Sequence, residues 1–563
     1  MRVACVLVFI LSLAHAEDED FTKQGDERFA ALKLSWCDRL VKLATWDDKT
    51  GLHDEARELC DRALLLLPDH AAAAALLEKQ KGKTDDVSYP DHKAQKQRIK
   101  DVEEHCKRID PIRTDWRKEV LATATWCESK HLDGPRNASL RLAIRLLGAD
   151  EFLAKCLAWP KVDGFGWVDP RQRDLLEPMS TYVYSADDAA RAKAKETISA
   201  AADLDLVELQ RTATLLNGYA DLPGKGAEEK EEVDLDGEKT DLWTRVPIRY
   251  KRAERWPAII LLHPKEAKAN NWVRIFKQCQ HVYDRNIVVA PTLVTPEDNL
   301  SWRTDKAVRQ VAACYRWLLE RYNVDTDRVF IDGFGIGAAA FLHGQYTPDR
   351  YAGILLRSRI YQMGSKPSEV GIANLMHLPT LFYLGTNVDK EREAEAKAVM
   401  DVMHEECCPI AYRIMIGKGE DPFTEASFDM LDWFEQQQRD MFPRRVTLTC
   451  QQDTPIPMTR AYWLEANDCS YKGRLDAEVK GNTIDVKADY VKEYTVWLSD
   501  NLVDLDQPVK IVTNGETSLE EKVERDRWVL LDHVRETRDR MRTFVAKVKV
   551  KVPWKKRDQK EDK

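Results

Sequence analysis

The chain has 563 residues, of which 44% are hydrophobic and 32% are charged. This composition excludes a disordered or fibrous chain, and the length exceeds what one hydrophobic core supports, so we expect several domains. Its 86 basic and 95 acidic side chains leave a formal net charge of −9. Such a chain lacks the basic footprint of nucleic-acid-binding proteins, so we expect no nucleic-acid partner.

Residues 1–16 have the pattern of a secretory signal peptide. Arg2 precedes the apolar run Val3–Leu13, and Ala14-His15-Ala16 then supplies a small-x-small cleavage motif. The apolar run is shorter than a helix that crosses a bilayer. We therefore expect an extracytoplasmic protein, secreted or periplasmic, with no membrane span.

Export permits disulfide bonds. Cleavage at this motif removes Cys5 and leaves eleven of the twelve cysteines. Cys450 and Cys469 are one candidate local pair, and the connectivity stays open at the level of sequence. The cluster from His404 to Cys408 lacks the second histidine that the zincin pattern needs at i+4, so we expect no metal and no other cofactor.

Residues 17–85 are predicted to be helical. Ala56, Cys60, Ala63 and Pro68 have spacings that resemble the second helix of a tetratricopeptide repeat. A plain helical hairpin fits the same residues, because a single repeat unit has no stacked neighbours. Both arrangements favour protein contact over chemistry, so we expect a protein partner at these helices.

The remaining chain divides by pattern. Residues 86–222 continue as a charged helical region, and residues 223–240 are predicted to be a charged linker because they bury little apolar area. Residues 241–443 alternate short apolar runs with helical patterns, which predicts a parallel sheet covered on both faces. The runs are 258–262, 287–290, 329–331, 381–384 and 412–416. Residues 444–553 are predicted to be a β-rich accessory domain whose separate strands include 461–465 and 475–479, and residues 554–563 a basic tail.

The run Val329–Ile331 leads directly into Gly333-Phe334-Gly335-Ile336-Gly337, and a helical pattern follows. Strand, glycine-framed turn and helix in this order resemble the nucleophile elbow of α/β-hydrolases, in particular secreted bacterial esterases and prolyl-oligopeptidase-like enzymes. The resemblance covers residues 242–442. It implies an α/β-hydrolase-like fold and a catalytic triad in the chain order nucleophile, acid, histidine.

The turn is kept, but its reactive group is absent. Gly333 and Gly337 flank the turn, and the nucleophile position is Gly335, which has neither a hydroxyl nor a thiol. The oxyanion loop also departs from the family pattern, since this chain has His263-Pro264 where related hydrolases carry His-Gly. Proline has no backbone N–H that could stabilise an oxyanion.

The other triad positions are changed too. The resemblance places the acid just after the run 381–384, where Asp389 is a candidate one position late. It places the histidine in the loop 417–423, which carries Glu420 and Asp421 but no histidine. Loss of nucleophile and base together leaves only residual effects of binding and electrostatics. The sequence therefore favours a degenerate active site and a protein that is not an enzyme.

Three functions stay open. The favoured one is an exported, non-catalytic pseudo-hydrolase that binds a protein or surface polymer, with a polymer or ester ligand in the former cleft. The second is an active serine-type esterase or peptidase with displaced residues. Ser358 and Cys314 are its candidate nucleophiles by type, although structural roles are commoner for such residues, as for His263 and His343. The third is a structural envelope component.

Overall fold

The computed structural model describes most of the chain: residues 2–67, 69–80, 92–130, 161–162, 166–201, 206–216, 228–248, 254–265, 269–275, 284–293, 301–360, 369–451 and 456–552, with single residues at 140, 155, 157, 250, 252, 282 and 454. The chain forms two compact units. The first comprises residues 1–162 and 166–170, and the second comprises residues 163–165 and 171–563.

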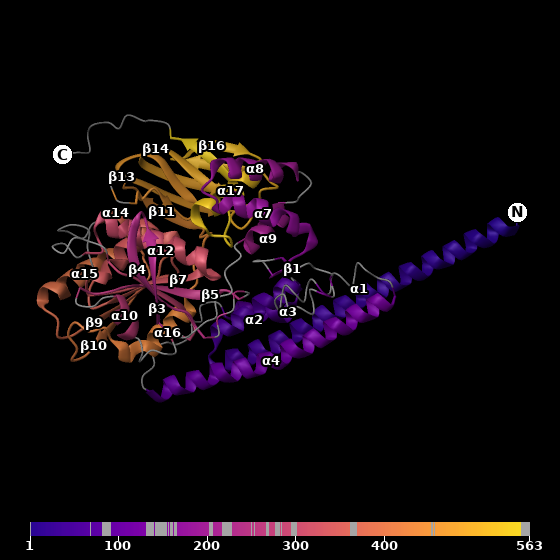
Figure 1. Cartoon of the computed structure of the whole chain (residues 1–563), viewed down its shortest axis with the longest axis horizontal. Coiled ribbons are helices and arrows are strands. Elements are labelled where there is room, and N and C mark those ends of the chain that lie inside the picture. Colours follow the sequence, from indigo (N-terminus) through magenta and orange to yellow (C-terminus); the bar gives the residue numbers. More distant parts are fainter. Residues whose placement is uncertain are drawn as a thin grey trace. The chain divides into compact units, whose positions relative to one another are not determined.

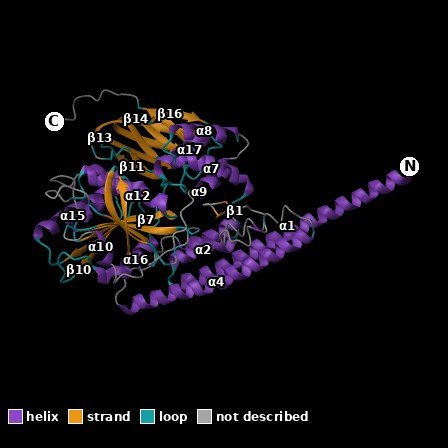
Figure 2. Cartoon of the chain, viewed as in Figure 1, coloured by secondary structure: helices purple, strands orange, loops and turns teal. Residues whose placement is uncertain are grey.

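The first unit is helical (Figure 2). Its elements are α1 (Arg2–Thr50), α2 (His53–Leu66), α3 (Ala71–Gln80) and α4 (His92–Ser129), followed by the short antiparallel strands β1 (Lys161–Val162) and β2 (Gly166–Trp167). The small residues Ala56, Cys60 and Ala63 are fully buried in its core, where Trp36 and Trp116 stack with ring centroids 4.5 Å apart. The helical N-terminal region is thus confirmed, whereas the relation to tetratricopeptide repeats and the signal peptide stay predictions.

Among the helices that the structure describes, none combines the length and apolarity needed to cross a membrane.

The predicted helical region 86–222 is divided between the two units. Helices α7 (Pro170–Tyr184), α8 (Asp188–Ala200) and α9 (Leu206–Leu215) lie in the second unit, beside α17 (Arg527–Thr537) (Figure 1). The Tyr182 hydroxyl donates to Asp532 at 2.5 Å, and Arg527 donates to the Ile198 carbonyl at 3.2 Å. These helices therefore belong structurally with the C-terminal part of the chain.

A parallel sheet forms the centre of the second unit. Among the described residues, eight strands pair in the order β10-β9-β8-β7-β5-β6-β4-β3, with β5 to β10 parallel and the hairpin β3–β4 antiparallel at one edge. The strands are β3 (Glu228–Leu235), β4 (Glu238–Arg245), β5 (Trp256–Leu262), β6 (Ile287–Pro291), β7 (Val324–Phe334), β8 (Gly353–Arg357), β9 (Thr380–Gly385) and β10 (Ile410–Met415).

Helices cover both faces of this sheet (Figure 1). They are α10 (Ala269–Ile275), α12 (Asp305–Arg321), α13 (Ala340–Tyr346), α14 (Glu369–Ile372), α15 (Lys390–Glu405) and α16 (Ser427–Gln436). Successive residues of β5 alternate between two cores: Ile260 packs with residues of α12 and α15, and Ile259 packs with residues of α10 and α16. A strand buried on both faces needs a continuous apolar run, which is why the sequence revealed β5, β6, β7 and β9.

The prediction of a charged linker at residues 223–240 is wrong for its second half. Glu228–Leu235 is strand β3, and β4 begins at Glu238. The hairpin has one solvated face, so acidic and basic residues alternate with few apolar ones. Its buried apolar side chains are Val233 and Leu235 of β3 and Leu242 of β4. Charged pairs such as Lys230–Asp241 at 2.9 Å join the two strands, so a high charge content here accompanies an edge hairpin rather than a linker.

The C-terminal region is β-rich, as predicted. Strands β11 (Arg445–Thr449), β12 (Arg460–Ala461), β13 (Leu464–Lys480), β14 (Thr483–Leu498), β15 (Val509–Thr513), β16 (Glu516–Glu521) and β17 (Ala546–Lys551) form one sheet. Segments 461–465 and 475–479, predicted as separate strands, lie within or next to the single long strand β13. The irregular pairing between Ala466 and Arg474 interrupts the alternation that reveals a strand in a sequence.

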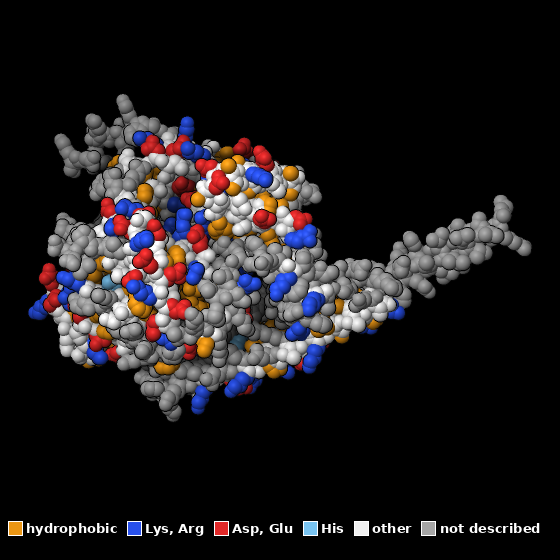
Figure 3. Space-filling view, viewed as in Figure 1, with side chains coloured by type: hydrophobic (Ala, Val, Ile, Leu, Met, Phe, Trp, Pro, Cys, Tyr) orange, Lys and Arg blue, Asp and Glu red, His pale blue; other side chains and the backbone are white. Residues whose placement is uncertain are grey.

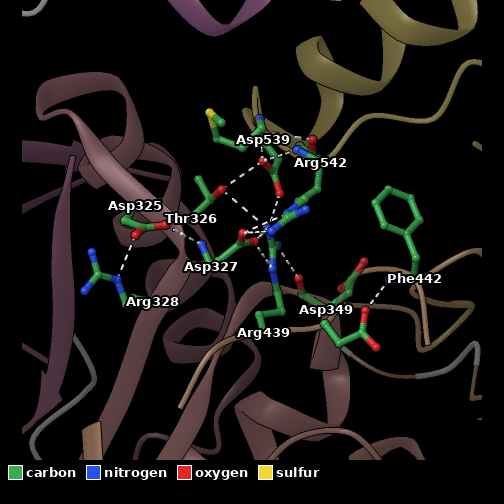
Figure 4. Close-up of polar contacts among 12 residues, drawn as sticks. Asp325, Thr326, Asp327, Arg328, Asp349, Arg439, Phe442, Asp539 and Arg542 are labelled. Carbon is green, nitrogen blue, oxygen red and sulfur yellow. Dashed lines mark hydrogen bonds and ion pairs between the residues drawn. The ribbon is translucent and has the colours of Figure 1, made fainter. Parts of the chain in front are cut away.

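A buried ion-pair network joins the parallel-sheet domain to the β-rich domain (Figure 4). Arg439 donates to Asp327 of β7 at 2.9 Å and to Asp539, which follows α17, at 2.5 Å. Arg542 pairs with the second oxygen of Asp327 at 2.7 Å. Since the side chain of Arg439 is only 2% exposed, the two domains share charged groups that are shielded from water.

Figure 3 shows acidic and basic side chains intermixed on the visible surface of the protein.

Candidate functional site

A strand–turn–helix elbow lies at the carboxyl end of β7. The backbone leaves the strand at Phe334, passes through Gly335 at φ +58°, and enters a short 3₁₀ turn before α13. A Cβ on Gly333 would lie 1.8 Å from the Gly337 carbonyl oxygen, and one on Gly337 would lie 2.0 Å from the Leu262 carbonyl oxygen. Both flanking glycines are therefore required by close backbone packing.

Gly335 differs from its flanking glycines because there is nearly room for a side chain. A Cβ at this position would lie 3.2 Å from the Cβ of Pro264 and 3.7 Å from Oε1 of Glu420. The elbow thus has the shape that presents a nucleophile, while the residue there presents none.

Glu420 occupies the space beside the nucleophile position. Its Oε1 lies 3.3 Å from Nε of Arg359, and its Oε2 lies 2.5 Å from a terminal nitrogen of Arg392. Both carboxylate oxygens are therefore engaged by guanidinium groups, at the point where the family pattern places the catalytic histidine.

The predicted acid position is part of the same chain of charges. Asp389 caps the N-terminus of α15, where its Oδ1 accepts from the backbone N–H of Arg392 at 2.8 Å and its Oδ2 lies 3.3 Å from Nε of Arg392. Asp389, Arg392 and Glu420 therefore follow one another where an acid and a histidine would be expected. A guanidinium is not deprotonated at physiological pH, so Arg392 cannot accept a proton and this series does not form a proton relay.

The loop that carries Glu420 is fixed by two residues at the end of β8. The Ser358 hydroxyl donates to the Asp421 carbonyl and accepts from the Asp421 N–H, both at 2.9 Å. Arg357 donates to the Pro422 carbonyl at 3.1 Å. Ser358 thus holds the loop with its hydroxyl, and the Asp421 carboxylate accepts from the Phe423 N–H at 2.7 Å to close a turn.

A buried ion pair beneath the elbow was not found from the sequence. Asp332 of β7 and Arg357 of β8 contact one another, with side chains 1% and 0% exposed. Burial raises the pKa of Asp332 to about 6, although the Arg357 guanidinium acts to lower it. A charged residue inside each of two otherwise apolar strand ends was the available signal. Only the pairing of β7 with β8, in which Asp332 lies opposite Leu355 and Arg357 opposite Phe334, brings the two side chains within reach of each other.

The two candidate histidines serve the core. Nε2 of His263 accepts from the Leu293 N–H at 3.2 Å, so its Nδ1 donates to the Pro264 carbonyl at 2.8 Å. The Trp302 indole donates to the His263 carbonyl at 2.9 Å, while Nε2 of His343 donates to the Trp302 carbonyl at 3.2 Å. Burial lowers the pKa of His343 to about 4, so this ring is neutral at pH 7.

The second candidate nucleophile, Cys314, is fully buried in α12, and burial raises its thiol pKa to about 12. The described residues include no group of three His, Cys, Asp or Glu side chains placed to hold a metal ion.

The order of the strands, the helices on both faces and the elbow at the end of β7 decide the architecture of this domain. It has an α/β-hydrolase-like fold. Neither a family model nor a curated protein sequence matches the chain.

Solved structures similar to part of this chain include a thermostable esterase, a ferulic acid esterase and esterase 2 of Thermogutta terrifontis. They share 16%, 16% and 13% sequence identity with this chain, at TM-scores of 0.30, 0.31 and 0.30. The similarity covers 38%, 37% and 38% of this chain and 63%, 96% and 95% of those proteins.

Proposed function

We propose that this chain is an exported pseudo-hydrolase, a hydrolase-like scaffold without acyl-transfer chemistry that binds a protein or a surface polymer. The observation that carries the proposal is the placement of Glu420 beside Gly335, with both carboxylate oxygens engaged by Arg359 and Arg392.

Acyl transfer by this fold requires a nucleophile, a general base and donors for the oxyanion. Gly335 supplies no nucleophile, and the guanidinium groups around Glu420 leave no histidine-like base. Pro264, in the oxyanion loop, lacks a backbone N–H. All three functions are missing at one place, which supports loss of catalysis rather than displacement of a single residue.

The binding part of the proposal rests on the modules around the site. A helical unit precedes the hydrolase-like domain and a β-rich domain follows it. Such modules commonly provide contact surfaces, and the former cleft would take the polymer or ester ligand. The motif at residues 1–16 supports action outside the cytoplasm.

Hydrolysis of p-nitrophenyl acetate by the purified chain tests the proposal, together with labelling by a fluorophosphonate probe. We expect no turnover above that of the uncatalysed reaction and no label. Gly335→Ser alone should remain inactive, because the serine would lack a base. The double variant with Gly335→Ser and Glu420→His should gain the fluorophosphonate label slowly.

The control is Glu425→Gln, a change in the same region that removes only a partner of Lys418 at 2.9 Å. The proposal would be refuted if the unmodified chain hydrolysed the ester and this activity were lost in Glu420→Ala or Ser358→Ala but kept in Glu425→Gln. Such a result would favour an active hydrolase with displaced residues.

A further inference from the structure

The β-rich domain places two cysteines from different strands against each other. Cys450 follows β11, and its N–H donates to the Gly473 carbonyl of β13 at 2.7 Å. Cys469 lies earlier in β13, and the irregular register between Cys469 and Arg474 brings it back toward the same place. Both cysteines are buried and lie against Gly473, Cys450 through its backbone N–H and Cys469 through its Cβ, so the two side chains share one place in the sheet.

Gly473 makes this contact possible. A Cβ on Gly473 would lie 2.9 Å from the Cβ of Cys469, closer than real side chains approach. The glycine opposite Cys450 therefore leaves the space that the Cys469 side chain uses to reach across the sheet.

Two of the other described thiols donate to backbone carbonyls. Cys37 donates to the Ala63 carbonyl at 3.3 Å, and Cys408 donates to the Ile372 carbonyl at 3.2 Å. For Cys450 the neighbour is a second thiol, which is the arrangement that oxidation converts into a covalent bond.

We propose that Cys450 and Cys469 form a disulfide bond in the exported protein. Two S–H bonds break and one S–S bond forms, and the two protons and two electrons pass to a disulfide oxidant, which becomes a dithiol. In the cell this oxidant is a disulfide-bearing oxidoreductase of the export compartment; in the test tube it is oxidised glutathione, which yields two molecules of the reduced form.

The bond would lie beside a contact between two domains. Thr449, next to Cys450, donates its N–H to Asn374 at 2.7 Å, and its hydroxyl accepts from the Gly371 N–H at 2.9 Å. A bond from Cys450 to β13 would therefore fix the end of β11, where Thr449 hydrogen-bonds to the hydrolase-like domain.

The timing of the reaction follows from burial. Hydrogen bonding to Cys469 and burial both raise the pKa of the Cys450 thiol, and only the thiolate attacks a disulfide. The bond therefore forms while the chain folds, and the folded, reduced protein should oxidise slowly.

The full chain is refolded with and without oxidised glutathione and then denatured without reductant. Free thiols are blocked with iodoacetamide; the protein is then reduced and labelled with N-ethylmaleimide. We expect Cys450 and Cys469 to carry the second label only after oxidative refolding. A portion digested without reduction should contain the two linked peptides at a mass two hydrogen atoms below the sum of the separate peptides. The melting temperature of the oxidised form should be higher by about 5–10 °C.

In Cys469→Ser, Cys450 should react with iodoacetamide, because its partner thiol is gone. In Cys314→Ser, Cys450 and Cys469 should both still carry N-ethylmaleimide. The proposal would be overturned if both cysteines carried the iodoacetamide label after oxidative refolding, or if either were linked to another cysteine. The same labelling of protein recovered from an oxidising compartment tests the export on which the cellular part depends. A bond formed in the test tube but not after expression there would overturn only that part.

Discussion

Replacing Arg439 by methionine should unfold the junction between the hydrolase-like and β-rich domains far more readily. The guanidinium is 2% exposed and lies between Asp327, 7% exposed, and Asp539, 4% exposed. It also donates to the Asp349 carbonyl at 2.6 Å. Arg439→Met keeps the volume but leaves two buried carboxylates without their shared cation, which costs about 3–5 kcal/mol of unfolding free energy.

Arg542→Met is the matched control. This arginine pairs with Asp327 as well, but its side chain is 37% exposed, so water replaces most of what is lost. We expect a cost of about 1 kcal/mol or less. Unfolding in urea, followed by tryptophan fluorescence, measures both values, and hydrogen exchange in Arg527–Thr537 assigns the transition to the junction.

The pH dependence separates charge from packing. Burial raises the pKa of Asp539, but the charge and hydrogen bond of Arg439, together with hydrogen bonds from the Met541 N–H and Thr326, outweigh it, so in the unmodified protein the pKa lies below its ordinary value. The stability from this group is present above the unfolded-state pKa and lost as the pH falls through the lower folded value. In Arg439→Met the charge and hydrogen bond of Arg439 are gone, and burial is opposed by the hydrogen bonds from Met541 and Thr326. The pKa of Asp539 should therefore rise, and the deficit should shrink as the pH falls from about 7 to about 4. A deficit equal to that of Arg542→Met, or one independent of pH, would refute the reasoning.

Two further predictions concern the elbow region. Gly385→Ala should destabilise the loop that carries Glu420, because its Cβ would lie 2.2 Å from the Lys418 carbonyl oxygen. Gly419→Ala should not, because its Cβ would make only an ordinary contact at 3.5 Å. Hydrogen exchange of the loop amides measures both variants, and equal effects would contradict this explanation. Asp332→Asn should remove a pH dependence: the folded pKa of about 6 exceeds the unfolded value, so the contribution of Asp332 is full below the unfolded pKa and is lost as the pH rises through about 6. Urea unfolding at several pH values between 4 and 7 should show a flatter profile for the variant, and parallel profiles would contradict the assignment.

The sequence predicted those parts of the fold that a local pattern encodes. The apolar runs 258–262, 287–290, 329–331 and 381–384 are within β5, β6, β7 and β9, because a strand buried on both faces needs apolar residues throughout. The hairpin at Glu228–Arg245 was missed because one of its faces is solvated and its sequence looks like a charged linker. Strand β13 was divided into segments because its irregular pairing breaks the alternation.

The candidate site was predictable in what it lacks. Gly335 has no side chain in any fold, and the sequence has no histidine between His404 and His533. The identity of a residue is local information, so these losses needed no structure. What stands in place of the lost groups depended on which distant segments meet.

Contacts between segments that are distant in the sequence are what only the tertiary structure decided. It places Glu420 between Arg359 and Arg392, and Arg439 between carboxylates of two domains. Ion pairs and thiol contacts form between residues far apart in the chain, and no spacing or periodicity records them. By itself the sequence therefore determined which residue types stand at the expected site positions, and the packing of the sheet, loops and β-rich domain determined which charged side chains meet there.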